Sequence, residues 1–137
     1  MKYLLNILCV VLFAMGTAIA DDKPTEKRFV ATIDKDGYQR AEMTAGEYYF
    51  DPAVVVVKVN VPIELTIKKA GGITPHNLTM KAPEADLDFT IELSSEPKKA
   101  TFMATKAGSY PFECSKKLLF FKSHKDRGMH GVLEVVE

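Results

Sequence analysis

The stretch Tyr110–Glu137, YPFECSKKLLFFKSHKDRGMHGVLEVVE, decides how this chain can fold. Its two ends belong to runs that are typical of β-strands, Ser109–Cys114 and Val132–Val136. Cys114, the only cysteine beyond residue 9, ends the first run, and the segment between the two runs carries two of the chain's three histidines and a methionine. The pattern therefore predicts a closing pair of strands that holds a loop rich in imidazole and sulfur groups.

Working outward, the preceding chain shows the same β pattern. Turn signals separate short apolar or alternating runs, and the Asp36-Gly37 signal predicts that the first two runs form a hairpin. About eight short strands without a helical period predict an all-β sandwich, with a barrel as the alternative. We expect Met43, Met80 and Met103 in the core, and an acidic, irregular segment with a short helical turn at 81–88. The other expected strands are residues 29–34, 38–43, 54–59, 63–68, 76–80, 89–93 and 100–104.

The N-terminal 20 residues have the features of a cleaved export signal. Lys2 is followed by the apolar run Leu4–Met15, and Ala18-Ile19-Ala20 matches a cleavage site after Ala20. We therefore expect a signal peptide at 1–20, a flexible segment at 21–28 and one domain at 29–137. The expected location is periplasmic or secreted, with no stable membrane insertion after cleavage.

Charge and cysteine content narrow the possible functions. The whole chain has 18 basic and 18 acidic residues. It contains no basic run with interleaved aromatic residues, the pattern that would predict nucleic-acid binding. After cleavage Cys114 is the only cysteine, so an intramolecular disulfide is excluded. Cysteine, histidine and methionine together favour soft metals such as copper, although zinc also binds cysteine and histidine.

Three segments resemble the cupredoxins, a family of small copper proteins. The first is Tyr49-Phe50-Asp51-Pro52 with the following valine strand, and the second is Pro75-His76-Asn77-Leu78. The third is Tyr110–Cys114 followed by His124, Met129 and Gly131, which is similar to the family's Y-x-F-x-C…H-x4-M-x-G closing hairpin. The resemblance implies a Greek-key β-sandwich with one mononuclear copper ion.

The same resemblance implies the ligand set. His76, Cys114 and His124 would bind copper in one plane, and Met129 would be the axial ligand, with His130 as the alternative to Met129. Asn77 would tie the two ligand segments together from the outer shell.

One feature departs from the family pattern. Nine residues, Ser115–Ser123, separate Cys114 from His124, which is a longer spacing than the family uses. A longer loop could open the site, as in red-copper proteins with a carboxylate ligand, for which Glu47 and Glu113 are the candidates. The inserted residues Leu118, Leu119, Phe120 and Phe121 either pack within the loop or form a docking surface for a redox partner.

We therefore expect a periplasmic protein that transfers single electrons rather than an enzyme. Two alternatives remain: a copper storage, delivery or resistance protein, and a copper enzyme with an open site.

Overall fold

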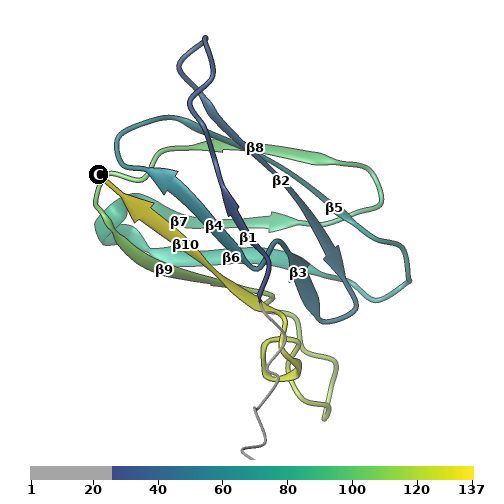
Figure 1. Ribbon diagram of the computed structural model, residues 1–137. Helices are drawn as coiled ribbons and strands as arrows, with labels where there is room; N and C mark the ends of the chain where they lie inside the picture. Colours follow the sequence, from purple (N-terminus) through teal and green to yellow (C-terminus); the bar gives the residue numbers. More distant parts are fainter. Residues whose placement is uncertain (1–25) are drawn as a thin grey trace, which may run out of the picture.

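The computed structural model describes residues 26–137. They form two β-sheets packed face to face with two short 3₁₀ turns, and no α-helix occurs in this range (Figure 1). The predicted sandwich is confirmed, and the barrel alternative is wrong. The predicted signal peptide lies outside the described residues. Within the described part, no helix has the length and apolar character that crossing a membrane requires.

The larger sheet positions most of the predicted ligands. Its parallel pairs are β1 with β4 and β4 with β10, while its other neighbours run antiparallel. The four valines of β4 are all buried, which is typical of a central strand with both faces covered. In spatial order the strands are β1 (Arg28–Val30), β4 (Val54–Lys58), β10 (His130–Val136), β9 (Gly108–Glu113), β6 (Asn77–Ala82) and β7 (Leu87–Glu92).

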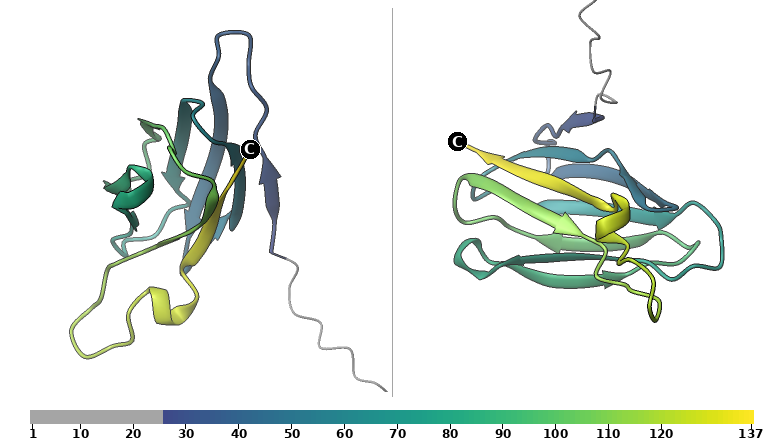
Figure 2. Two further views of the ribbon diagram at one scale, coloured as in Figure 1. Left: turned by 90° about the vertical axis from the view of Figure 1, so that its left-hand side faces the viewer. Right: turned by 90° about the horizontal axis from the view of Figure 1, so that it is seen from below.

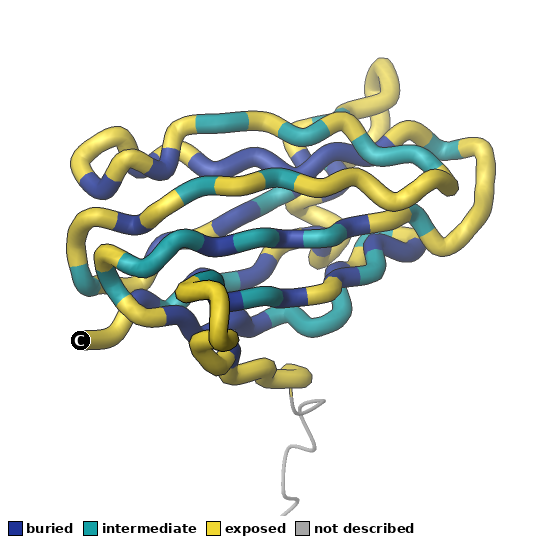
Figure 3. The backbone as a smooth tube through the Cα atoms, turned by 90° about the horizontal axis from the view of Figure 1, so that it is seen from above, coloured by how far each residue is buried: buried dark blue, intermediate teal, exposed yellow. Residues whose placement is uncertain are grey.

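The smaller sheet covers the other side of the core. Along β5 the apolar side chains of Ile63, Leu65 and Ile67 are buried, while the residues between them are partly exposed. This alternation is the expected pattern for a strand with one face toward the core (Figure 3). In spatial order the strands are β3 (Tyr49–Asp51), β2 (Gln39–Gly46), β5 (Ile63–Lys69) and β8 (Lys98–Phe102).

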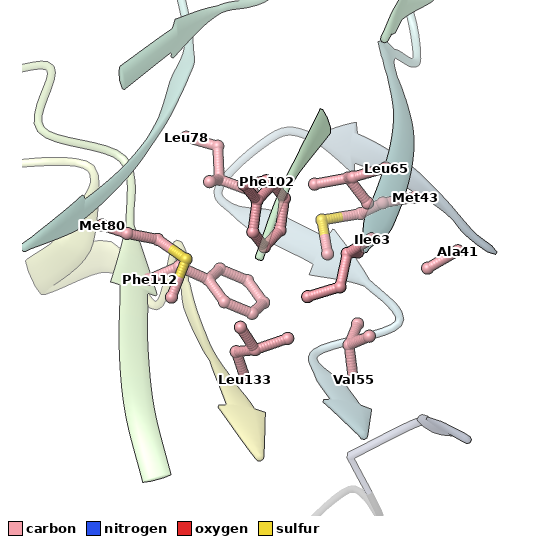
Figure 4. Close-up of a pocket in the computed structure, with 10 residues that line it drawn as sticks. All are labelled: Ala41, Met43, Val55, Ile63, Leu65, Leu78, Met80, Phe102, Phe112 and Leu133. Carbon is pink, nitrogen blue, oxygen red and sulfur yellow. The ribbon is translucent and has the colours of Figure 1, made fainter. Parts of the chain in front are cut away.

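The core between the sheets is apolar and closely packed. A cavity of about 20 Å³ lies among side chains from both sheets, including Met43, Met80 and Phe112 (Figure 4). It has room for about one water molecule but no polar lining to bind one. Met43 and Met80 are buried as predicted, whereas the prediction for Met103 is wrong, because it lies just beyond β8 and is 41% exposed.

Three details differ from the expected strands. The Asp34–Gly37 turn forms, but β1 joins β4 in the larger sheet while β2 joins the smaller one, so the predicted hairpin is wrong. The strand-type pairing beside the turn is limited to an isolated bridge, Ile33 to Gln39. The short strand β3 also adds to the count, giving ten strands within residues 26–137. In the segment 81–88, which was expected to be irregular, only Pro83–Ala85 forms a 3₁₀ turn, and the residues on either side extend β6 and β7.

Candidate metal centre

The sheet itself brings His76 and Cys114 together. His76 immediately precedes β6, and Cys114 immediately follows β9. These strands are antiparallel neighbours, with Thr79 opposite Glu113, so the start of β6 and the end of β9 lie at the same edge. His124 comes from the loop between β9 and β10, directly before the 3₁₀ turn Lys125–Arg127 (η2).

One ligand atom from each of these residues converges on a single buried point. The Nδ1 atoms of His76 and His124 are 3.1 Å apart. The Sγ atom of Cys114 lies 3.9 Å from Nδ1 of His76 and 3.4 Å from Nδ1 of His124. All three side chains are at most 3% exposed. Among residues 26–137, no other group of histidine, cysteine or carboxylate residues forms such a cluster.

This donor set fits a soft transition metal. Bonds of about 2.0 Å to nitrogen and 2.3 Å to sulfur would separate trigonal ligand atoms by roughly 3.5 Å, close to the observed distances. Two facing imidazole nitrogens can share one proton in a hydrogen bond, and a metal ion between them would bind both lone pairs instead. Two histidines with one cysteine are the equatorial donors of blue-copper sites.

The protonation of both histidines also suits metal binding. Burial lowers the pKa of His76, and the neighbouring His124 lowers it further. Burial is also the main cause that lowers the pKa of His124, followed by the charge of Arg127. Both imidazoles are therefore neutral at pH 7, which is the form that binds metals.

Met129 is placed by the backbone around the cluster. Its N–H donates to the carbonyl of His124, and its own carbonyl accepts the N–H of Cys114, both at 3.0 Å. The side chain is fully buried. Gly128 ends the 3₁₀ turn in a left-handed conformation, φ 103°, which glycine adopts without strain. The predicted axial ligand is thus held between the other two loop ligands.

Asn77 links the two ligand segments. Its side-chain Oδ1 accepts the N–H of Ser115 at 2.8 Å, and its Nδ2 donates to Ser115 Oγ at 2.9 Å. Its backbone N–H points at Cys114 Sγ at 3.5 Å. A donor at this position withdraws charge from the sulfur and fixes its orientation.

Sequence reasoning missed Tyr48 and Arg127. The Tyr48 ring meets the His124 ring edge-to-face at 5.1 Å between centroids, and the His76 ring at 6.1 Å. The Arg127 guanidinium lies 4.6 Å above the Tyr48 ring. Tyr48 has a φ of 63°, an unusual conformation for a bulky residue. The aromatic run at 48–50 was visible in the sequence, but nothing in it indicated contact with the ligands.

The alternative ligands lie in different places. His130 is exposed and does not belong to the cluster. Glu113 forms an ion pair with Lys125 at 2.6 Å. Glu47 Oε1 is 3.8 Å from Nε2 of His76, which is the ring nitrogen away from the cluster. That Nε2 atom is buried and has no hydrogen-bond partner among the described residues, so Glu47 is placed to act on His76 rather than to bind the metal.

The inserted loop extends away from the sandwich beyond the cluster (Figure 2). Its four apolar side chains, Leu118–Phe121, are all exposed, so they do not pack into the core. His124 lines two surface cavities at the base of this loop, of about 190 and 230 Å³. Leu118 lines both of them, and Phe121 lines the smaller.

Comparison with solved structures identifies the fold. No family model matches the sequence, and no curated protein matches it either. The metal binding domain of the Cu(I) exporting P-type ATPase CopA of Streptococcus pneumoniae superposes with a TM-score of 0.62 at 18% identity, covering 82% of this chain and 99% of that domain. Dithionite-reduced auracyanin from Roseiflexus castenholzii superposes with a TM-score of 0.58 at 18% identity, covering 72% of this chain and 97% of that one.

A third structure, described as a copper binding protein in the apo form, gives a TM-score of 0.58 at 20% identity and covers 78% and 95% of the two chains. The chain therefore has the cupredoxin fold, and the resemblance seen in the sequence is confirmed at this level. Its His-Cys-His cluster with a buried methionine is of the kind that suits a blue-copper site.

Proposed function

We propose that this chain is a periplasmic copper protein that transfers single electrons. His76, Cys114 and His124 would hold one copper ion, with Met129 as a further ligand. The observation that carries the proposal is the convergence of two neutral imidazoles and one thiol on a buried point of a cupredoxin fold. Copper at this position would supply a one-electron couple between Cu(II) and Cu(I).

The surrounding residues keep the ligand atoms in place during electron transfer. Ser115 is bound by Asn77, and the backbones of Cys114 and His124 are both hydrogen-bonded to Met129. Burial of the ligands excludes water, and the Asn77 N–H stabilises negative charge on sulfur. A site fixed in this way before electron transfer needs little rearrangement when its charge changes.

We further propose that the redox partner approaches at the base of the inserted loop. His124 and Leu118 line both cavities there. Lys122 also lines the smaller cavity, and Lys117 lines the larger. A protein bound over these cavities would therefore lie close to the imidazole of His124. Export of the chain, through the predicted signal peptide, would place this exchange in the periplasm.

The absorption and EPR spectra of the Cu(II)-loaded protein test the proposal. An intense sulfur-to-copper charge-transfer band with narrow copper hyperfine splitting is the expected result, and Cys114→Ser should abolish the band. Ser115→Ala is the matched control, because it removes a neighbouring hydroxyl without touching a ligand atom. If Cys114 reacts equally fast with thiol reagents with and without copper, copper–thiolate binding is disproved.

Reduction and reoxidation of the loaded protein test the transfer role separately. Reversible cycling without loss of copper is expected. Copper that leaves the reduced protein readily in the presence of a chelator would contradict electron transfer and favour copper delivery. A spectrum altered by azide would instead indicate an open site of the enzyme type.

A further inference from the structure

The tip of the inserted loop is a tight turn that the metal centre does not use. Phe121 N–H donates to the carbonyl of Leu118 at 2.9 Å, which places Leu119 and Phe120 at the corner of the turn. Leu119 has a φ of 45°, in the left-handed region that favours glycine or asparagine. Two apolar residues therefore occupy positions where turns usually carry Gly, Asn or Asp.

Neither the core nor the cavities explain these two side chains. Leu119 is 75% exposed and Phe120 is 101% exposed. Neither lines the cavities beside His124, unlike Leu118 and Phe121 at the base of the turn. Ile73, which lines one of those cavities, is also 100% exposed. The same end of the molecule thus presents three fully or largely exposed apolar side chains.

The loop is also strongly cationic in a chain without net charge. Residues 115–128 carry five basic residues and one acidic residue, a net charge of +4, which leaves −4 on the rest of the chain. Lys116 and Lys125 form ion pairs with Glu92 and Glu113. Lys117 and Lys122, which flank the apolar residues on either side, form no ion pair within residues 26–137.

We propose that this tip inserts reversibly into the interface of a membrane that contains anionic lipids. Leu119 and Phe120 would enter the boundary between headgroups and acyl chains, while Lys117 and Lys122 would remain at the level of the lipid phosphates. An apolar tip between free cations is complementary to such a surface. A protein partner would need a matching pocket for a narrow, protruding turn, whereas a lipid interface needs no shape complementarity.

Membrane binding would orient the metal centre. His124 follows Phe121 by three residues, so insertion of the tip places the cavities beside His124 against the membrane surface. The partner proposed above would then be reached at the membrane. The insertion itself needs only the apo protein, so it can succeed or fail independently of copper binding.

A single tryptophan can report insertion, because the chain contains none. The metal-free Phe120→Trp variant is mixed with phosphatidylcholine vesicles, or with vesicles of phosphatidylcholine and phosphatidylglycerol at about 3:1. With anionic vesicles we expect a blue shift of the emission and quenching by brominated acyl chains. Ile33→Trp is the matched control, since Ile33 is half-exposed beside the turn at the opposite end (Figure 1) and should show neither effect.

Charge reversal tests the role of the lysines. Lys117→Glu with Lys122→Glu, in the Phe120→Trp background, should weaken partitioning into anionic vesicles by at least about tenfold, and high salt should act in the same direction. An unchanged Phe120→Trp emission would overturn the proposal and leave the tip as a protein contact. Equal binding of the charge-reversed variant, or an equal shift in the Ile33→Trp control, would overturn it too.

Discussion

At the metal end of the sandwich, partly buried hydrogen bonds between neutral groups join the ligand segments, whereas exposed ion pairs hold the turn at the opposite end (Figure 1). Asn77 binds Ser115 beside the fully buried Cys114. At the other end, Arg40 pairs with Asp34 and Asp36, each at 2.6 Å, and all three side chains are more than a third exposed.

This difference matters for function. Hydrogen bonds between neutral groups carry no charge for salt to screen, and partial burial protects them from competition by water. Exposed ion pairs contribute little and are screened by salt. The chain therefore has its precise contacts where a metal must be held, and the comparison can be tested with substitutions at each end.

The largest effect is expected at Gly131. A Cβ atom at this position would clash with the carbonyl of Ala53 and the ring of Phe112, inside the strand that follows the ligand loop. Gly131→Ala should lower the free energy of unfolding by about 3 kcal/mol, measured by urea denaturation of the apo protein. Gly37→Ala is the control, because it meets open space and costs only the strain of a positive φ. Equal losses in the two variants would show that crowding at Gly131 is unimportant.

A smaller loss is expected at Asn77. Asn77→Ala removes both side-chain bonds to Ser115, each worth about 1 kcal/mol, so the apo protein should lose about 2 kcal/mol of stability. Thr79→Ala on the same strand removes one hydroxyl contact, to Thr90 at 3.0 Å, and should cost less. High salt should leave the Asn77→Ala effect unchanged. A salt-dependent effect would mean that the metal end is not held as described.

We expect Glu47 to affect the reduction potential of the copper and not the stability of the fold. Its carboxylate lies 3.8 Å from Nε2 of His76, where negative charge favours the more positive, oxidised centre. Glu47→Gln should raise the reduction potential of the copper-loaded protein by on the order of 50 mV at low ionic strength, measured by voltammetry. Glu113→Gln should change the potential less, because Lys125 already neutralises that carboxylate. A lowered potential in Glu47→Gln would contradict this role.

The smallest effect is expected at the opposite end and depends on pH. The hydrogen bond from Arg40 lowers the pKa of Asp36 to about 2. This value is below the unfolded value of about 3.9, so the stabilisation is complete above pH 4 and is lost as the pH falls through 2. Asp36→Asn should therefore be slightly less stable than the parent at pH 7 and equal to it near pH 2, in urea denaturation across this range. A constant difference at all pH values would contradict the ion pair as its cause.

Much of the centre was predictable because its signals are local. The spacing of Cys114, His124 and Met129 lies within one hairpin, and the alternating runs at 63–68 and 109–114 specify strands through their own periodicity. Glu47, Tyr48 and Arg127 were harder to assign. Their contacts join segments far apart in the chain, and no local pattern records them.

By itself, the sequence determined the class of fold, the turn at Asp36-Gly37, and the residues able to bind a soft metal, since strand periodicity, turn chemistry and ligand type belong to single residues or short runs. Only the tertiary structure decided that β1 pairs with β4 rather than β2, that His76 meets Cys114, and that Leu119 and Phe120 face solvent. Strand pairing and burial depend on which distant segments compete for the same edge or face, and that competition is settled by the packing of the whole chain.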